Sequence, residues 1–305
     1  MKSIKLYNDK YIKVSKIGGG SFGAVYLVKE KDTNNLYAMK KFYLDNLSNG
    51  GAKKQYEILS KFNHENIHKV IDMFISKNNN QYLITPYYPN NLYDYVSQKL
   101  PEKAIKQIIF QILNGVNYIH NLKYIHRDIK PDNILLSSKG KIILTDFDLC
   151  RQESKGKDDT MTRTAVTLFY RAPEIFYGDS YYGNKIDIWS LGCVFAELII
   201  GRPLFKANNE LGTLSNIIET IGCPNEENWP GVSQLPNYLP FGGGKFQLGK
   251  ILEEGGLSKE GIGIVTQMLM LDPKKRPSCE EFLKKEYFKK DIISPDELVK
   301  IMNLK

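Results

Sequence analysis

The sequence predicts an α+β chain of two lobes: a small, mainly β lobe over residues 1–88 and a larger, mainly α lobe over residues 89–290, followed by a tail over residues 291–305. Two observations predict this class. The segments YIKVSKI, AVYLVKE, LYAMKKF and QYLITPYY alternate apolar and polar positions, which is typical of strands with one packed face. From Asn91 onward, the apolar positions instead recur with a helical period.

One helix is expected in the small lobe, in the segment AKKQYEILSKF, where the spacing of Tyr56, Leu59 and Phe62 gives them one face. The large lobe should contain helices at NLYDYVSQ, PEKAIKQIIFQILNGVNYIHN, DIWSLGCVFAELIIG, LGTLSNIIETIG and EGIGIVTQMLML. Short β-like pieces (NILLS, KIILTDF) and the polar loop RQESKGKDDTMTRT separate the second helix from the third. Because ligands favour clefts between such lobes, we expect a site near the junction at residues 86–90.

The composition is that of an ordinary globular protein, with 42% hydrophobic and 25% charged residues, and excludes a disordered, collagen-like or coiled-coil chain. The net charge of +8 is concentrated in residues 1–88, which hold fourteen lysines against seven acidic residues. These lysines are scattered in runs of two at most. We therefore expect no direct nucleic-acid binding, and favour a solvated surface or a face for an acidic partner or nucleotide.

The four cysteines lie far apart, without a CxxC pair, and predict reduced thiols in an intracellular protein. The opening residues contain no apolar stretch, so we expect no signal peptide. The most apolar run, from Ile188 to Ile200, includes Glu197 and is too short to span a bilayer. It predicts a buried helix and no membrane partner.

A glycine-rich motif of the form GxGxxGxV runs from Gly18 to Val25 between two expected strands. Glycines permit positive φ and let backbone N–H groups approach phosphate. By itself the motif also fits an ordinary hairpin, and a dinucleotide-binding fold is disfavoured because no helix follows. Lys40 lies on the next expected strand. An inward lysine needs a carboxylate partner, and Glu57 of the small lobe's helix can supply one.

The strongest signal is a set of motifs in a fixed order: HRDIKPDN at residues 126–133, TDF at 145–147, YRAPE at 170–174 and DIWSLG at 187–192. Together with the glycine motif and Lys40, they resemble the signature set of eukaryotic protein kinases. The resemblance covers roughly residues 11–288. It implies the bilobal protein-kinase fold and the transfer of the γ-phosphate of ATP to a protein.

The resemblance assigns the transfer step to the motif at residues 126–133 and its surroundings. Asp128 would accept or orient the proton of the substrate hydroxyl. Lys130 would neutralise charge on the transferred phosphoryl group and matches the serine/threonine pattern, and Thr167 completes this catalytic set. His126 is expected to be a packing residue, and Glu174 is expected to form a salt bridge with Arg276.

The resemblance also assigns the cofactors, ATP and Mg²⁺. Lys40 would hold the α- and β-phosphates, oriented by Glu57, and Asn133 and Asp146 would bind Mg²⁺. At the junction, Thr85 would be the gatekeeper, and the Pro86 carbonyl and the Tyr88 backbone would face adenine. The residues expected to bind the nucleotide, besides Lys40, are Ile17, Gly18, Gly19, Gly20, Ser21, Phe22, Gly23, Val25, Ala38, Thr85, Pro86, Tyr88 and Leu135.

Finer features resemble the cyclin-dependent kinases, among them LGCVFAEL at residues 191–198 and TIGCP at 220–224. In that family, the residues matching Val166 and Arg171 leave a pocket for proline after the target residue. We therefore expect Ser/Thr-Pro substrates and a cyclin or other regulatory subunit. Residues 217–241 look most like the CDK-activating branch, which would place the chain in transcription or the cell cycle, and in the nucleus or the cytoplasm, with the nucleus favoured.

Thr162 aligns with the activation-loop phosphosite of this family, and Arg127 and Arg151 are placed to clamp its phosphate. An unmodified Thr162 remains the alternative.

Two departures from the family pattern leave other functions open. Asp148 stands where the family motif DFG has glycine, and GGAKKQYEIL replaces the cyclin-contacting helix pattern. They keep open a pseudokinase scaffold that binds partners without turnover, and a cyclin-independent kinase of the same group.

Overall fold

The computed structural model describes residues 6–20, 23–43, 51–153, 167–240, 242–244 and 246–304. The chain forms two compact units. The first comprises Met1–Pro89 together with Thr145–Asp148, and the second comprises Asn90–Leu144 and Leu149–Lys305. The first is mainly β and the second mainly α, so the predicted α+β class is confirmed. Thr145–Asp148 joins the first unit although it lies far along the chain.

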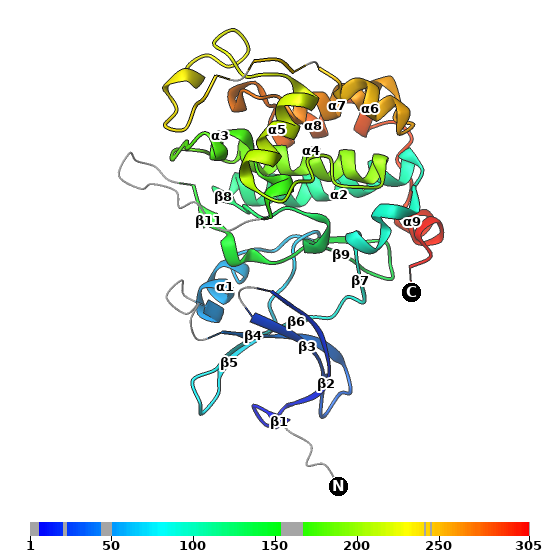
Figure 1. The fold of residues 1–305 in the computed structure, drawn as a ribbon. Coiled ribbons are helices and arrows are strands. Elements are labelled where there is room, and N and C mark those ends of the chain that lie inside the picture. Colours follow the sequence, from blue (N-terminus) through cyan, green and yellow to red (C-terminus); the bar gives the residue numbers. More distant parts are fainter. Residues whose placement is uncertain are drawn as a thin grey trace. The chain divides into compact units, whose positions relative to one another are not determined.

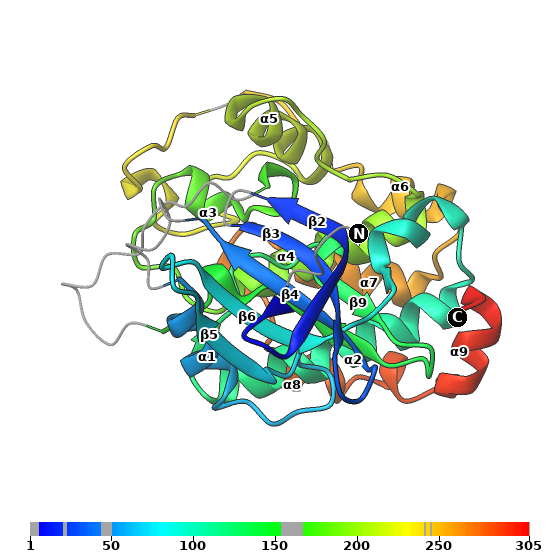
Figure 2. The same ribbon diagram turned by 90° about the horizontal axis from the view of Figure 1, so that it is seen from below.

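The first unit is built on one antiparallel sheet with the strand order β1-β2-β3-β4-β6-β5 (Figures 1 and 2). Helix α1 contacts β5 and β6. The elements are β1 (Leu6–Tyr7), β2 (Tyr11–Gly20), β3 (Gly23–Glu30), β4 (Leu36–Phe42), α1 (Gly51–Leu59), β5 (Asp72–Ile75) and β6 (Gln81–Pro86).

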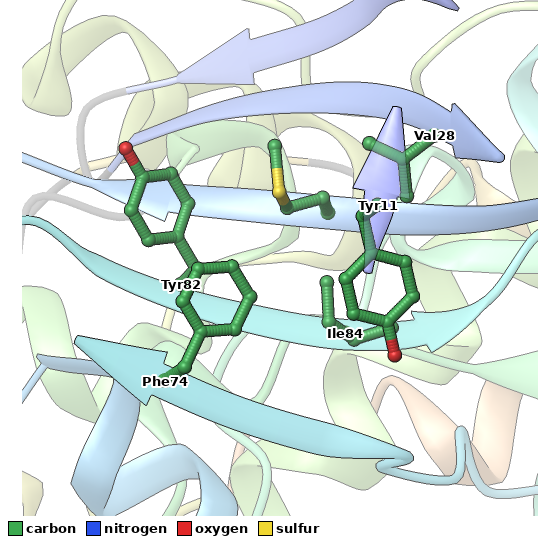
Figure 3. Close-up of a cluster of buried hydrophobic side chains, with 6 residues drawn as sticks. Tyr11, Val28, Phe74, Tyr82 and Ile84 are labelled. Atoms are coloured by element: carbon green, nitrogen blue, oxygen red, sulfur yellow. The ribbon is translucent and has the colours of Figure 1, made fainter. Parts of the chain in front are cut away.

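One face of this sheet carries an aromatic core, drawn in Figure 3. The rings of Phe74 and Tyr82 stack with their centroids 4.9 Å apart, and Tyr11 lies parallel to Phe74 at 6.4 Å. Val28, Met39 and Ile84 complete the cluster. Buried aromatic rings of this size contribute strongly to stability, so this face supplies much of the packing that stabilises the sheet.

The opposite face carries the candidate site residues, because successive side chains of a strand point to opposite sides. Lys40 follows the buried Met39 and therefore points away from the aromatic core. The sheet register pairs Lys40 with Val25 on β3, and Ala38 with Thr85 on β6. Cross-strand partners lie on the same face. The register thus puts four residues predicted for the nucleotide site on one surface.

Helix α1 buries only part of the predicted stripe. Its buried residues are Ala52, Gln55, Ile58 and Leu59, and Phe62 just beyond it is also buried, whereas Tyr56 is 37% exposed. The prediction is therefore confirmed at Leu59 and Phe62 and wrong at Tyr56, whose place on the buried face Gln55 takes. The reason is that Gln55 finds a polar partner inside the unit, so a polar residue occupies a position that the apolar pattern excluded.

The second unit is mainly helical (Figure 1). Its α-helices are α2 (Glu102–Asn121), α3 (Pro173–Phe176), α4 (Lys185–Ile200), α5 (Glu210–Ile221), α6 (Leu248–Glu254), α7 (Lys259–Met268), α8 (Cys279–Leu283) and α9 (Pro295–Met302). Its strands are β7 (Asn90–Asn91), β8 (Tyr124–Ile125), β9 (Ile134–Leu136), β10 (Ile142–Leu144) and β11 (Arg151–Gln152). Its 3₁₀ turns are η2 (Leu92–Gln98), η3 (Pro131–Asn133), η5 (Leu168–Tyr170), η6 (Val232–Gln234), η7 (Pro273–Lys275) and η8 (Glu286–Phe288), and η4 (Phe147–Leu149) bridges the two units in sequence.

Helix α4 forms the centre of this unit and contacts α2, α6 and α7. It is mostly apolar, as expected of a buried helix, and every residue from Ile186 to Ile199 is buried, including the polar Asp187, Ser190 and Glu197. It ends at Gly201, whose φ of +78° suits glycine. In the described residues, no helix combines the length and the apolarity that a membrane span requires.

The segment predicted as a tail contains helix α9. Ser294 caps its N-terminus, Leu298 and Met302 are buried, and Glu297 forms an ion pair with Lys103 of α2 at 2.7 Å. The last residues described are therefore packed on the second unit.

Candidate active site

The candidate site residues fall into one group in each unit. In the first unit, β2 and β3 pair as far as Gly20 and Gly23, while Ser21 and Phe22 lie outside the described residues. A Cβ at Gly23 would collide with the carbonyl oxygen of Lys41, whereas one at Gly20 would meet open space. None of these glycines has positive φ. Close approach of β3 to β4, rather than positive φ, is thus what requires glycine at position 23.

Lys40 lies between two carboxylates of the segment Thr145–Asp148. Its Nζ is 2.8 Å from Asp146 Oδ1 and also forms an ion pair with Asp148 Oδ2. The Lys40 side chain is 18% exposed, and those of Asp146 and Asp148 are 30% and 7% exposed. Burial by itself would lower the pKa of Lys40, but the two carboxylates outweigh it and raise that pKa. Lys40 is therefore held as an ammonium ion.

The predicted Lys40–Glu57 pair is wrong. Glu57 lies on the exposed side of α1, two residues beyond Gln55, which points inward. The Gln55 amide donates a hydrogen bond to Asp148 Oδ1, while Asp148 Oδ2 receives Lys40. Sequence reasoning missed Gln55. The sequence signal for Gln55 was a polar residue on the helix face that Ala52 and Leu59 define.

Asp148 is a buried acid, with only 7% of its side chain exposed. Its burial raises its pKa, a trend that Asp146 reinforces and Lys40 opposes. Phe147, between the two aspartates, packs against Phe62 with the ring centroids 5.7 Å apart. The alternation of Asp146, Phe147 and Asp148 therefore combines a hydrophobic anchor with two carboxylates on Lys40.

His68, which the sequence did not single out, connects the end of β6 to the same segment. Its Nε2 is 3.0 Å from the carbonyl oxygen of Pro86, and its Nδ1 is 2.6 Å from Thr145 Oγ1. A carbonyl oxygen only accepts, so Nε2 carries the proton and Nδ1 accepts from Thr145. Burial lowers the pKa of His68 to about 4, which keeps the ring neutral at pH 7.

Two of the residues predicted at the junction, Pro86 and Tyr88, contact this histidine. Thr85 is buried, and the Tyr88 ring meets His68 edge-on at 5.5 Å between centroids. The Pro86 carbonyl, predicted to face adenine, already accepts one hydrogen bond and has a second lone pair for another contact. Of the other predicted nucleotide contacts, Ile17 lies at a register shift of β2 and Leu135 belongs to β9 of the second unit.

In the second unit, Asp128 accepts two hydrogen bonds on one oxygen. Lys130 Nζ is 2.9 Å and Asn133 Nδ2 is 2.8 Å from Asp128 Oδ2. Lys130 also donates to Thr167 Oγ1 at 3.2 Å. The structure therefore brings together four residues predicted for catalysis and metal binding. Asp128 Oδ1 has no donor among the described residues, which leaves it available to a substrate hydroxyl.

Asp187 of α4 holds the backbone of this loop. Its carboxylate accepts from the backbone N–H groups of His126 and Arg127, both at 2.9 Å, and from His120 Nε2 at 2.8 Å. Burial would raise the pKa of Asp187, but these hydrogen bonds and the charge of His120 outweigh it and lower the pKa. Arg127 has a φ of +72°, a strained value that such bonds can maintain.

The buried His126 is a structural residue, because its Nδ1 accepts the backbone N–H of Asp128 at 3.2 Å. The predicted salt bridge between Glu174 and Arg276 is confirmed, with two N–O distances of 2.7 Å and both side chains fully buried. The His126 contact fixes the backbone at Asp128, and the ion pair ties the segment of Glu174 to that of Arg276.

Arg127 and Arg151, the predicted phosphate clamp, both lie near Tyr182. Burial raises the pKa of Tyr182, and the charges of the two arginines oppose that rise. Arg127 also lies over the Tyr182 ring, 5.8 Å from its centroid. Thr162 and Val166 lie outside the described residues. Arg171, predicted to help select proline, forms an ion pair with Glu210 of α5.

The mainly β unit with its glycine hairpin and buried lysine, and the mainly α unit with its Asp128 cluster, define a phosphotransferase of the kinase class. A family model described as the protein kinase domain matches residues 11–288, which is most of the chain. The chain belongs to the protein kinase family, whose members use ATP together with a divalent metal ion.

The residues predicted for metal binding have suitable donor atoms. Asn133 uses its amide nitrogen to bond the backbone oxygen and Oδ2 of Asp128, at 2.9 and 2.8 Å, and this orientation leaves its Oδ1 as an acceptor. Asp146 is partly exposed and contributes carboxylate oxygens. Such hard oxygen donors suit Mg²⁺. Asn133 in the second unit and Asp146 in the first thus each offer an oxygen donor of the kind that a divalent metal would use.

Proposed function

We propose that the chain is a serine/threonine protein kinase that uses Mg²⁺-ATP and phosphorylates Ser/Thr-Pro sites. The observation that carries this proposal is the Asp128 cluster. One Asp128 oxygen is occupied by Lys130 and Asn133, and the other faces no protein donor among the described residues. A carboxylate so oriented can accept the proton of an incoming hydroxyl.

Each remaining residue has a task in this proposal. Lys130 places a positive charge beside Asp128. There it can stabilise the negative charge that develops while the phosphoryl group is transferred. Lys40 binds the non-transferred phosphates. When bound, the divalent metal neutralises phosphate charge. The rate then depends mainly on positioning and electrostatics, which these fixed side chains provide.

The resemblance to cyclin-dependent kinases supports the finer proposal. On this proposal, the chain binds a cyclin or other regulatory subunit and is phosphorylated on Thr162. It acts in transcription or CDK activation in the nucleus. The proximity of Arg127 and Arg151 to Tyr182 supports the phosphate clamp, because two guanidinium groups near one point can bind a doubly charged phosphate.

The experiment is transfer of radiolabel from [γ-³²P]ATP to peptides that differ only at the target and the next residue: Ser-Pro, Thr-Pro, Tyr-Pro and Ser-Ala. The proposal predicts labelling of Ser-Pro and Thr-Pro, and about tenfold less labelling of Ser-Ala. Labelling of Tyr-Pro alone would refute the serine/threonine assignment.

The Asp128→Asn variant serves as the blank in this assay. A pseudokinase scaffold would give equal signals for this variant and the wild-type chain, with and without added cyclin. Equal wild-type labelling with and without cyclin would instead favour the cyclin-independent kinase.

A further inference from the structure

We propose that Asp148 is the positioning residue of Lys40, and that with Gln55 it replaces the helix glutamate as the group that orients this lysine. The inference rests on the proposed kinase function and adds a residue pair to it.

The contacts form an unbroken chain across three elements of the first unit. Gln55 of α1 donates to one carboxylate oxygen of Asp148, and Lys40 of β4 donates to the other. Gln55 is 4% exposed, so both ends of the carboxylate are satisfied within the protein interior. A carboxylate bonded through both oxygens is fixed in orientation, and it fixes the ammonium bound to it.

The charges of these residues explain why position 148 carries an acid. The α1 side chain that points toward this cluster is a neutral amide, which cannot balance a buried ammonium ion. The family motif DFG would place glycine at position 148, which also supplies no charge. Asp148 contributes the carboxylate that Gln55 lacks, and Gln55 contributes the hydrogen bond that holds it.

Asp146 cannot take over this role alone. It also contacts Lys40, but its side chain is 30% exposed and its oxygens are the ones suited to the metal. A lysine whose sole carboxylate was Asp146 would share that partner with a divalent cation. Asp148 gives Lys40 a partner of its own.

Glu57 offers no alternative in this arrangement. It lies on the exposed side of α1, opposite to Gln55. The proposal therefore separates two residues of one helix: Gln55 matters for Lys40, and Glu57 does not.

The test moves the carboxylate between the two positions. Asp148→Gly should lower kcat/KM for ATP about 30-fold, and Asp148→Asn, which preserves shape, about tenfold. The double variant Gln55→Glu/Asp148→Gly places the acid on the helix instead, and should recover kcat/KM to within about threefold of wild type. Asp32→Asn removes an exposed acid of the same unit and is the matched control.

A second readout does not depend on phosphoryl transfer. Lys40 should react slowly with an acylating reagent in the wild-type chain, because its side chain is only 18% exposed and its Nζ is bonded to the carboxylates of Asp146 and Asp148. Asp148→Asn should raise the labelling rate of Lys40, measured by peptide mass spectrometry, about tenfold. Asp32→Asn should leave that rate unchanged.

The outcomes separate this inference from the kinase assignment. If wild-type chain transfers no phosphate but Asp148→Asn still accelerates Lys40 labelling, the function is wrong and the positioning role stands. If transfer occurs and both Asp148 variants match wild type in kcat/KM and labelling, the positioning role is wrong. A loss in Glu57→Gln as large as in Asp148→Asn would also overturn it.

Discussion

Lys130 donates a hydrogen bond to Asp128 at 2.9 Å, and the same Nζ lies 3.2 Å from the hydroxyl of Thr167. The lysine thus connects the loop that carries Asp128 with the residue that begins the next described segment. In the proposed mechanism, this one positive charge would stabilise both the Asp128 carboxylate and the negative charge that develops on the transferred phosphoryl group.

Replacing Lys130 by Met should lower kcat about 100-fold and leave the KM for peptide nearly unchanged, because the charge acts mainly in the transition state. Thr167→Val keeps the shape and removes only a neutral hydrogen-bond partner, so we expect a loss of about threefold to tenfold. Steady-state kinetics on one Ser-Pro peptide measures both. A Lys130→Met enzyme with wild-type kcat would remove Lys130 from the mechanism.

Gly23→Ala should destabilise the first unit by about 1–3 kcal/mol, because the new methyl group would overlap the Lys41 carbonyl oxygen. The matched variant is Gly20→Ala, whose methyl group meets open space and should change the unfolding free energy by less than about 1 kcal/mol. Urea unfolding compares the two. Equal stability of both variants would show that β3 and β4 lie further apart than described.

Breaking the buried pair by Glu174→Gln should cost about 3–5 kcal/mol of unfolding free energy, because Arg276 would keep a buried charge without its carboxylate. Removing both charges with Glu174→Gln/Arg276→Met should cost less. Glu280→Gln removes an exposed ion pair with Lys284 and should have no measurable effect. If Glu174→Gln matched Glu280→Gln, the pair would not hold the fold.

The buried His68 should make stability depend on pH. Its folded pKa of about 4 lies below the ordinary 6.5, so between these values the unfolded chain binds more protons. Stability from the neutral ring is complete above about pH 6.5 and is lost as the pH falls toward 4, by about 3 kcal/mol in total. His68→Gln should lose this component of the pH profile. Parallel profiles of unfolding free energy for wild type and variant would contradict it.

Much of the fold was predictable because strands and long helices impose local periods. The alternation of LYAMKKF gave β4 and put Met39 and Lys40 on opposite faces, and the apolar run of α4 indicated a buried helix. The segment NLYDYVSQ, in contrast, forms a 3₁₀ turn, since seven residues with a polar cap do not distinguish the two helix types by pattern.

Site residues within one contiguous motif were predictable from the sequence. Partners that lie far apart in the sequence were not. Asp128, Lys130 and Asn133 lie within six residues of each other and were found together. Gln55 and Asp148 are 93 residues apart, and neither has a local pattern that names the other. Two departures from the family motif were visible separately, and only the fold shows that they meet at Lys40.

The most direct test of the central claim is a crystal structure of the chain with Mg²⁺ and a non-hydrolysable ATP analogue. The account predicts Lys40 Nζ on the α- and β-phosphates, and Asn133 Oδ1 and Asp146 carboxylate oxygens as ligands of metal ions bound to the same nucleotide. A nucleotide bound elsewhere, or metals held by neither Asn133 nor Asp146, would contradict it.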